Sequence, residues 1–338
     1  MNRGPRITVL GAGSIGCFVG GVWQSAGLPV TFIGRPKLSH DIAAHGLTLT
    51  DYSGREVRLP PESVDYRCSP EALAEADVIL VAVKSGDTAQ AAAEIDKHGH
   101  DGATVISLQN GISNVDVLER GLLGRFEIAR GMVIFNVAYL SDGRFHKGVA
   151  GDVWTDRRDA TQALAERVGS GLAALKLSDR MLDLAWGKLL INLNNAVNAL
   201  SGETLLRELR RRDYRRVFAA AMKEGLRLLD AAEIEPAQIG PLPLGLLARV
   251  LESPDWLFNN VFFRMWKVDP KARSSMSDDL AAGRKTEVDY LNGELIRVAE
   301  RLQVDAPVNR AIVELVHKAE AGAPPLAPKA LANAVLGG

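Results

Sequence analysis

Several polar side chains lie within the largely apolar stretch between Trp186 and Gly202, which is predicted to be a helix, and three of them share one side of it. These three are Lys188, Asn192 and Asn195, at spacings of four and three residues. At about 100° per residue, Asn192 lies about 40° to one side of Lys188 and Asn195 about 20° to the other. An amine on a narrow stripe of a buried helix loses solvation, and its pKa falls. This stripe suits a lysine that exchanges protons, although a lysine passing two amides at a helix seam has the same pattern.

A glycine-rich turn near the start of the chain predicts a dinucleotide-binding unit. A short apolar strand is followed by the turn Gly11, Ala12, Gly13, Ser14, Ile15 and Gly16, and then by a helical stretch from Cys17 to Ala26. In this G-x-G-x-x-G turn, Gly11 allows the tight bend, Gly13 admits a pyrophosphate, and Gly16 lets helix and strand pack closely. The N-terminus of the helix then offers free N–H groups to the diphosphate.

The end of the second predicted strand indicates which dinucleotide is bound. This strand, Pro29–Ile33, lacks the terminal carboxylate that usually contacts the ribose of NAD. Arg35 follows instead, and its guanidinium can pair with a 2′-phosphate. The sequence therefore favours NADPH/NADP as the cofactor, the alternative being a surface arginine without a ligand.

Two more polar groups follow strands of the same predicted sheet. Residues 77–83 and 104–108 are continuous apolar runs, as buried parallel strands are. Lys84 follows the first run and Asn110 the second, so both fall at carboxyl ends of strands, where ligands bind in doubly wound sheets. An Asn-Gly pair also makes ordinary turns, which is the alternative for Asn110.

The remaining elements complete an α/β domain and a helical domain. We predict a hairpin around Ser53–Gly54, one long or two short strands over 126–140, strands within 145–154 that finish the sheet, and a helix over 160–174. From about residue 182 the chain is helical. The predicted fold is a Rossmann-type doubly wound domain (1–178), an all-α domain (179–325), and a loosely ordered tail (326–338), since residues 321–338 are rich in Ala, Pro and Gly.

Four further stretches of the second half bear on packing or on a site. Residues 208–233 form a long amphipathic pattern whose arginines we expect to point outward, and the aromatic run 256–266 is more typical of packing than of a substrate wall or dimer face. Ser275 and Asp278 fit a capping box at the start of a helix. Glu287 lies among apolar neighbours, whereas Asp289 is expected to face solvent.

The composition narrows the class of protein. Hydrophobic residues make up 47% and charged residues 24% of 338 residues, and the formal net charge is -1, so we expect no nucleic acid and no membrane as partner. The two cysteines, Cys17 and Cys68, are expected to be small buried hydrophobes in a reducing compartment. The six histidines lack ligand spacing, so no metal is predicted. Without a signal or membrane-span pattern, we expect a cytoplasmic protein.

Taken together, these motifs resemble the ketopantoate reductase (2-dehydropantoate 2-reductase) family over nearly the whole chain. The matching marks are GAGSIG at 11–16, Arg35, VK at 83–84, QNG at 109–111, WGKLLIN at 186–192, and RSSM with KTEVDYLNG within 273–293. The resemblance implies a Rossmann-type domain, a helical domain, and an active site in the cleft between them. It also implies the NADPH-dependent reduction of ketopantoate, a small 2-oxo acid, to pantoate, a step of pantothenate biosynthesis.

The resemblance also assigns roles. Lys188 matches the general acid that protonates the ketone oxygen, and Glu287 matches a glutamate that contacts the cofactor and substrate region. Asn192 matches an asparagine that binds the substrate, and Ser275 matches a serine that binds the carboxylate of the substrate. The remaining matches concern the cofactor: Asn110 beside the nicotinamide ribose and substrate, Lys84 near the adenosine end, and Ala138 at a backbone contact.

One departure from the family pattern bears on the substrate. Family members often carry a second asparagine eight residues after the lysine, followed by proline, whereas here residue 196 is alanine. Asn194 and Asn195 lie just before it. Asn195 points to the side of Lys188 and is therefore the candidate for the same substrate contact. This departure leaves open an oxidoreductase acting on another 2-oxo or hydroxy acid. A separate alternative is a non-catalytic NADP-binding protein with the same fold. A homodimer is compatible with the sequence, although no signature indicates it.

Overall fold

The computed structural model describes residues 4–262 and 272–337, and the chain divides into two compact units. The first unit runs to Met181, and the second begins at Leu182. The predicted aromatic run falls partly outside the described residues, because Phe263, Met265 and Trp266 belong to the undescribed segment.

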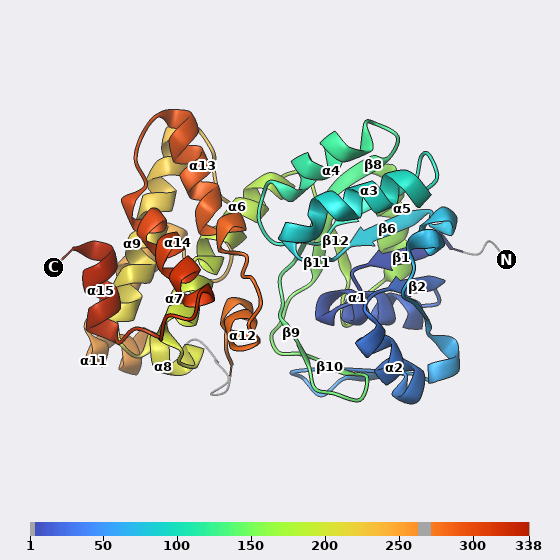
Figure 1. The fold of residues 1–338 in the computed structure, drawn as a ribbon, viewed down its shortest axis with the longest axis horizontal. Coiled ribbons are helices and arrows are strands. Elements are labelled where there is room, and N and C mark those ends of the chain that lie inside the picture. The colour runs from blue at the N-terminus through green and yellow to red at the C-terminus, as the bar shows by residue number, and fades with distance from the viewer. Residues whose placement is uncertain (1–3, 263–271, 338) are drawn as a thin grey trace. The chain divides into compact units, whose positions relative to one another are not determined.

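The first unit is built on an eight-stranded sheet (Figure 1). Its strands are, in spatial order, β12 (Leu175–Ser178), β11 (Val153–Asp156), β8 (Glu127–Val133), β7 (Thr104–Ser107), β6 (Val78–Val81), β1 (Ile7–Leu10), β2 (Val30–Ile33) and β5 (Asp65–Arg67). From β5 to β8 all neighbours are parallel, and β11 runs antiparallel to β8. This doubly wound order changes direction between β1 and β6, so the chain segments that leave these two strands are neighbours. The predicted fold class is confirmed.

Helices cover both faces of this sheet. On one face lie α1 (Ser14–Ser25) and α5 (Asp159–Val168), and on the other α3 (Thr88–His98) and α4 (Asn114–Leu122). Alternate residues of β1 explain the arrangement, since Val9 packs with the α1 core and Leu10 with the α3 core. A short helix, α2 (Pro36–His45), follows β2.

A second, four-stranded sheet packs against the outer side of α1. Its order is β4 (Glu56–Leu59), β3 (Leu47–Asp51), β10 (Arg144–Lys147) and β9 (Val137–Tyr139). The antiparallel β3–β4 pair confirms the hairpin around Ser53–Gly54, and 126–140 forms two strands, β8 and β9. The expectation that both strands within 145–154 finish the main sheet is wrong. Phe145 of β10 is buried with Leu47 and Leu49 over α1, so β10 pairs with β3 and only β11 joins the main sheet.

The second unit is helical in its described part. Its helices are α6 (Met181–Asn192), α7 (Asn194–Ser201), α8 (Leu205–Leu209), α9 (Arg212–Ala231), α10 (Leu244–Leu251), α11 (Asp255–Leu257), α12 (Ser275–Ala281), α13 (Asn292–Leu302), α14 (Pro307–Glu320) and α15 (Pro328–Leu336). Single turns η4 (Phe258–Phe262) and η6 (Val288–Tyr290) lie between them. None of the described helices is both long enough and apolar enough to cross a lipid bilayer.

The predicted helix over 186–202 differs at its start and in its middle. It begins at Met181 and is divided at Leu193, whose φ of -56° and ψ of -26° resemble a tighter helical turn. It ends where predicted, at Gly202, whose φ of 64° favours glycine.

Three other expected elements differ in the structure. The helix expected over 160–174 ends at Val168, since Gly169 breaks it and β12 follows. The amphipathic pattern 208–233 divides into α8 and α9, and Arg215 of α9 is fully buried rather than outward. The tail is a helix, α15, because Leu331, Ala332 and Val335 are buried against the unit.

Candidate functional site

The glycine turn has the geometry that a bound pyrophosphate requires. Gly11 has a φ of 98°, and a Cβ there would lie 2.5 Å from the backbone nitrogen of Val83, just after β6. At Gly16 a Cβ would lie 2.6 Å from the Gly11 carbonyl oxygen, so this glycine lets α1 approach β1. A Cβ on Gly13, at the N-terminus of α1, would meet nothing within 4 Å. The backbone therefore leaves open space at the one position where a diphosphate must approach.

Ala12, Ser14 and Ile15 complete this turn in different environments. Ala12 is buried and its carbonyl oxygen accepts a hydrogen bond from the Tyr66 hydroxyl, at 3.1 Å. Ser14 and Ile15 are partly exposed in the first turn of α1. The turn thus has one residue anchored to the protein and the next ones open to a ligand.

Arg35 lies directly after β2, the position at which a dinucleotide-binding domain is expected to contact the ribose that carries the 2′-hydroxyl or 2′-phosphate. It is exposed and forms the N-cap of α2, directly after β2 and Gly34. The described structure thus leaves its guanidinium at the protein surface at the carboxyl edge of the sheet.

A buried network of polar side chains fixes the segments that follow β6 and β7. Ser85 and Asn114 both donate to the Asn110 carbonyl oxygen, and the Thr88 hydroxyl donates to Asn114 Oδ1 at 2.8 Å. Gln109 donates to the Thr88 hydroxyl at 2.7 Å. These four supporting side chains are buried. The network holds the backbone of Asn110 in place, and the sequence reasoning did not identify it.

Lys84 and Ala138 belong to the same unit but to different sheets. Lys84 is exposed after β6, at the carboxyl edge of the main sheet. Ala138 is exposed on β9 of the smaller sheet, opposite His146 of β10. Their predicted cofactor contacts remain predictions.

In the second unit, Lys188, Asn192 and Asn195 share the partly exposed stripe of α6 and α7. Each is partly exposed, whereas neighbours such as Leu189 and Leu193 are buried. The helical spacing that predicted the stripe thus coincides with the side of the helix pair that is less covered by protein.

The environment of Lys188 lowers the pKa of its ammonium to about 8. The larger cause is desolvation: although the side chain keeps some contact with solvent, the surrounding protein penalises the charged form. The negative charge of Glu287 opposes this effect. Glu287 itself is 8% exposed and lies at the start of the η6 turn. A lysine in this state can hold a proton at neutral pH and release it readily.

The segment that carries Glu287 is held by a carboxylate from another helix. Glu320, at the end of α14, accepts hydrogen bonds from the backbone nitrogen and hydroxyl of Thr286, each at 2.8 Å. Lys285 adds an ion pair at 3.0 Å. Although burial opposes it, these partners lower the pKa of Glu320, so the anchor is a carboxylate at neutral pH. Asp289 is exposed, as expected.

The structure separates the roles of Asn194 and Asn195. The Asn194 side chain is buried and donates to Glu208 Oε2 at 3.1 Å, so it faces the interior. Asn195 is partly exposed, and its backbone oxygen accepts from the Ser274 hydroxyl at 3.1 Å. Of the two, only Asn195 lies on the stripe of Lys188.

The capping interaction near Ser275 is displaced by one residue from the expected one. Ser274 is the N-cap of α12 and accepts from the Ser277 backbone nitrogen at 3.1 Å, so Ser275 and Asp278 do not form the predicted capping box. Asn198 holds the Ser274 backbone nitrogen at 2.9 Å, which fixes the cap at that residue. Ser275 is exposed in the first turn and is not used for capping.

The aromatic run and the two cysteines were both expected to be buried, and in each case one residue is buried and another is exposed. Phe258 is fully buried under the Arg215 guanidinium, 4.0 Å from the ring centroid, whereas Trp256 is 69% exposed. Cys17 is buried, which raises the pKa of its thiol, but Cys68 is exposed on the strand edge after β5. Sequence alone could not separate Phe258 from Trp256, because Arg215, whose guanidinium covers the Phe258 ring, lies far away along the chain.

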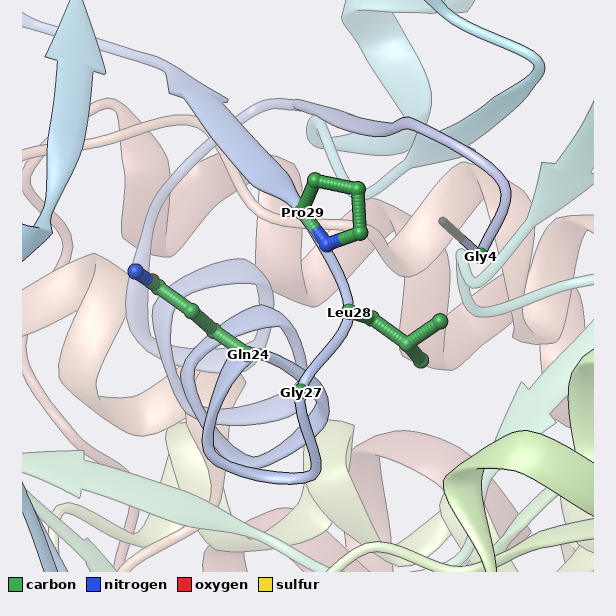
Figure 2. A pocket seen from close by; sticks show the side chains of 5 residues that line it. All are labelled: Gly4, Gln24, Gly27, Leu28 and Pro29. Carbon is green, nitrogen blue, oxygen red and sulfur yellow. The ribbon is translucent and has the colours of Figure 1, made fainter. Parts of the chain in front are cut away.

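The cavity drawn in Figure 2 lies away from the glycine turn. It has a volume of about 380 Å³ and is lined by Gly4, Gln24, Gly27, Leu28 and Pro29. These residues lie around the C-terminal end of α1, whereas the glycine turn is at its N-terminal end. Within the described residues no cluster of three or more His, Cys, Asp or Glu side chains could hold a metal ion.

Comparisons with known proteins give a consistent result over both units. The family profile described as ketopantoate reductase PanE/ApbA matches residues 7–159, and the profile of its C-terminal domain matches residues 180–320. A 2-dehydropantoate 2-reductase of Halobacterium salinarum is 28% identical over 93% of this chain and 99% of its own length. One from Pyrococcus abyssi is 28% identical over 94% and 98%.

Solved structures agree in fold. A PanE/ApbA family ketopantoate reductase from Ralstonia eutropha superposes with a TM-score of 0.77 at 28% identity, covering 94% of this chain and 98% of that one. A D-mandelate dehydrogenase in complex with NADH and anilino(oxo)acetate has a TM-score of 0.76 at 21% identity, over 94% and 98%. At that lower identity the likeness concerns the fold alone.

Proposed function

We propose that this chain reduces 2-dehydropantoate to pantoate with NADPH. The chain belongs to the ketopantoate reductase family and is therefore an oxidoreductase. The observation that carries this proposal is Lys188, whose pKa is lowered to about 8 beside Glu287 on the partly exposed stripe of α6. A reductase needs a proton donor of this kind where the ketone oxygen gains negative charge.

The first unit supports the cofactor part of the proposal. The open space at Gly13 and the N-terminus of α1 suit a diphosphate, and Arg35 suits a 2′-phosphate, which favours NADPH over NADH. Lys84, Asn110 and Ala138 are proposed to complete the cofactor contacts. When bound, the nicotinamide supplies a hydride to the ketone carbon.

The second unit supports the substrate part. Lys188 donates a proton to the ketone oxygen as this oxygen becomes an alkoxide, and the neutral amine is then reprotonated from solvent. The carboxylate of Glu287 favours the ammonium before the transfer. Asn192, Asn195 and the exposed hydroxyl of Ser275 are proposed to bind the carboxylate and hydroxyl groups of the 2-oxo acid.

A second candidate follows from Ala196, which stands where the family often has asparagine. Loss of one amide changes the polar contacts available to a substrate, and a site that lacks a hydrogen-bond partner discriminates differently among analogues. The same machinery would then reduce another 2-oxo acid.

A substrate panel tests the proposal. NADPH oxidation would be followed by absorbance with ketopantoate, pyruvate and 2-oxoisovalerate, and repeated with NADH. The proposal expects ketopantoate to have the highest kcat/KM and NADPH to be preferred. A higher kcat/KM for another acid favours the second candidate, and tight NADPH binding without turnover of any acid favours a non-catalytic NADP-binding protein.

A further inference from the structure

A buried carboxyl group lies beneath the helix that carries Asn195. Glu208 of α8 is fully buried, and its Oε2 accepts hydrogen bonds from two side-chain amides of α7, Asn194 at 3.1 Å and Asn198 at 3.3 Å. The proposed reaction does not use Glu208. Its protonation state therefore determines how the two amides of α7 are held.

Two buried oxygen atoms in this cluster lack hydrogen-bond donors. They are Glu208 Oε1 and Asn194 Oδ1, and each belongs to a group already joined to the other through Asn194 Nδ2 and Glu208 Oε2. Buried acceptors without donors are costly. A proton on Glu208 Oε1 would supply the one missing donor and let acid and amide pair through two hydrogen bonds.

The charges around Glu208 do not compensate an anion. The guanidinium of Arg215 is directed elsewhere: it donates to the backbone oxygens of Leu209, Leu251 and Ser253 and forms an ion pair with Asp255 at 2.9 Å. The other ionisable groups near the cluster are Tyr214 of α9 and, flanking it, Glu203 and Arg211, while the polar side chains of α7 are amides and the hydroxyl of Ser201, none of which is charged.

The pKa of Glu208 agrees with this geometry. Burial raises it to about 8, against the opposing effects of the Asn194 and Asn198 hydrogen bonds and the Arg215 charge. At neutral pH the group is therefore mostly a neutral carboxylic acid, which donates as well as accepts.

Asn198 connects this acid to the start of α12. Its Nδ2 donates to Glu208 and to the Glu203 backbone oxygen at 3.1 Å, so its Oδ1 must point the other way. That Oδ1 accepts the Ser274 backbone N–H at 2.9 Å, and the Ser274 hydroxyl donates to the Asn195 backbone oxygen. The chain of contacts ends at Asn195 and at the residue before Ser275, both proposed substrate ligands.

We propose that Asn198, oriented by the protonated carboxyl group of Glu208, is a positioning residue that fixes Ser275 and Asn195 for the 2-oxo acid. The inference rests on the proposed function for its substrate. Its chemistry, an acid–amide pair that orients a second amide, stands on the second unit alone.

The first test compares Asn198→Ala with Asn309→Ala. Asn309 is also a fully buried amide of the second unit, but it is bonded to Glu224 and Asn292 rather than to the cap of α12. Removing the Asn198 contact should raise KM for the 2-oxo acid by about 5- to 10-fold, the worth of one neutral hydrogen bond, with NADPH affinity unchanged. Asn309→Ala should lower Tm without that change in KM. Equal KM values in the two variants would overturn the positioning role, and Asn198→Ser replaces Asn198→Ala if the latter does not fold.

The second test uses Glu208→Gln, which reproduces the donor and acceptor pattern of the neutral acid. KM should remain at the wild-type value. The folded state keeps a proton that an unfolded glutamate, with its ordinary pKa of 4.5, releases at lower pH. The wild type should therefore lose stability relative to Glu208→Gln as pH rises from about 5 to 8. Tm would be measured by calorimetry over that range.

The outcomes of these tests are separable from failure of the proposed function. A Tm difference between wild type and Glu208→Gln that is flat from about pH 5 to 8, or that shifts in favour of wild type as pH rises, means that Glu208 is ionised and overturns the acid–amide pair. This measurement needs no turnover. If the wild type reduced no 2-oxo acid, the proposed function would fail while the Tm comparison still decided the state of Glu208.

Discussion

Lys188 links the structure to the pH dependence of the reaction. Its pKa of about 8 arises from burial, and Glu287 keeps it from falling further. Since the ammonium is the proposed donor, kcat/KM for reduction should fall as pH rises through about 8 in the wild type. Replacing Glu287 with glutamine removes the charge that favours the ammonium, so the midpoint should move to lower pH.

A pH profile of NADPH oxidation, recorded for wild type and Glu287→Gln, checks this expectation. Glu314→Gln is the matched control, because it makes the same chemical change at an exposed position of α14. A midpoint that stays in place or rises in Glu287→Gln would contradict the electrostatic role of this carboxylate.

Arg35 provides the second residue-scale prediction. A guanidinium paired with a 2′-phosphate contributes charge-assisted hydrogen bonds worth about 1.5–3 kcal/mol, so Arg35→Ala should weaken NADPH binding about 10- to 100-fold. NADH binding should stay at its wild-type level, because NADH has no such phosphate. Titrations monitored by nucleotide fluorescence would measure both, with Arg58→Ala, at an exposed arginine of β4, as the control.

Equal losses of NADPH and NADH affinity in Arg35→Ala would mean that Arg35 supports the fold of the site rather than the 2′-phosphate. The sequence could single out Arg35 as a candidate, because the proposed role depends only on its place directly after β2. It could not predict Glu208 or Arg215, whose burial depends on Asn194, Asn198 and Asp255, residues 10 to 40 positions away.

At the scale of elements, the turn between β1 and α1 offers a matched pair of substitutions. A Cβ at Gly13 meets nothing within 4 Å, whereas one at Gly16 meets the Gly11 carbonyl oxygen at 2.6 Å. Gly13→Ala should therefore leave Tm nearly unchanged and weaken NADPH binding, since the methyl group occupies the space open to the diphosphate. Gly16→Ala should lower Tm, because helix and strand must separate.

Calorimetry and NADPH titration of both variants distinguish the two roles. Undiminished NADPH affinity in Gly13→Ala would place the diphosphate elsewhere. The motif predicted this element from sequence because all its constraints are local: strand, turn and helix are consecutive.

The C-terminal helix carries a prediction about stability. Leu331 of α15 is fully buried, and the hydroxyl of Tyr214 on α9 donates to the Leu326 backbone oxygen just before the helix. Leu331→Ala should destabilise the protein by about 2–5 kcal/mol, the usual cost of a large-to-small change in a core. Denaturant unfolding measures it, with Lys329→Ala on the exposed side of α15 as the control. A loss no larger than that of the control would mean that α15 does not stabilise the unit.

Elements whose position depends on distant partners were the ones that sequence reasoning placed wrongly. The composition of residues 321–338 suggested a loose tail, but Leu331, Ala332 and Val335 are buried and form one side of a helix. The N-cap of α12 is Ser274 rather than the predicted Ser275, because Asn198, 76 residues earlier, accepts a hydrogen bond from the Ser274 backbone nitrogen. β10 joined the smaller sheet because α1 is apolar on the side that faces it.

At the scale of the whole molecule, the proposed reaction draws on both units. The first supplies the glycine turn, Arg35 and Asn110 for the dinucleotide, and the second supplies Lys188 and its neighbours for the 2-oxo acid. The order of these motifs along the chain was sufficient to predict the α/β fold followed by helices. It was not sufficient to predict the substrate, because Ala196 alters the set of amides without altering the fold.

The most direct test of the proposed mechanism is turnover of ketopantoate by wild type and Lys188→Ala, with NADPH binding measured on the same samples. We expect kcat to fall about 10²- to 10⁴-fold in the variant, as is usual for loss of a general acid, while NADPH affinity is retained. A variant that reduced ketopantoate at the wild-type rate would contradict the assignment of Lys188 as the proton donor.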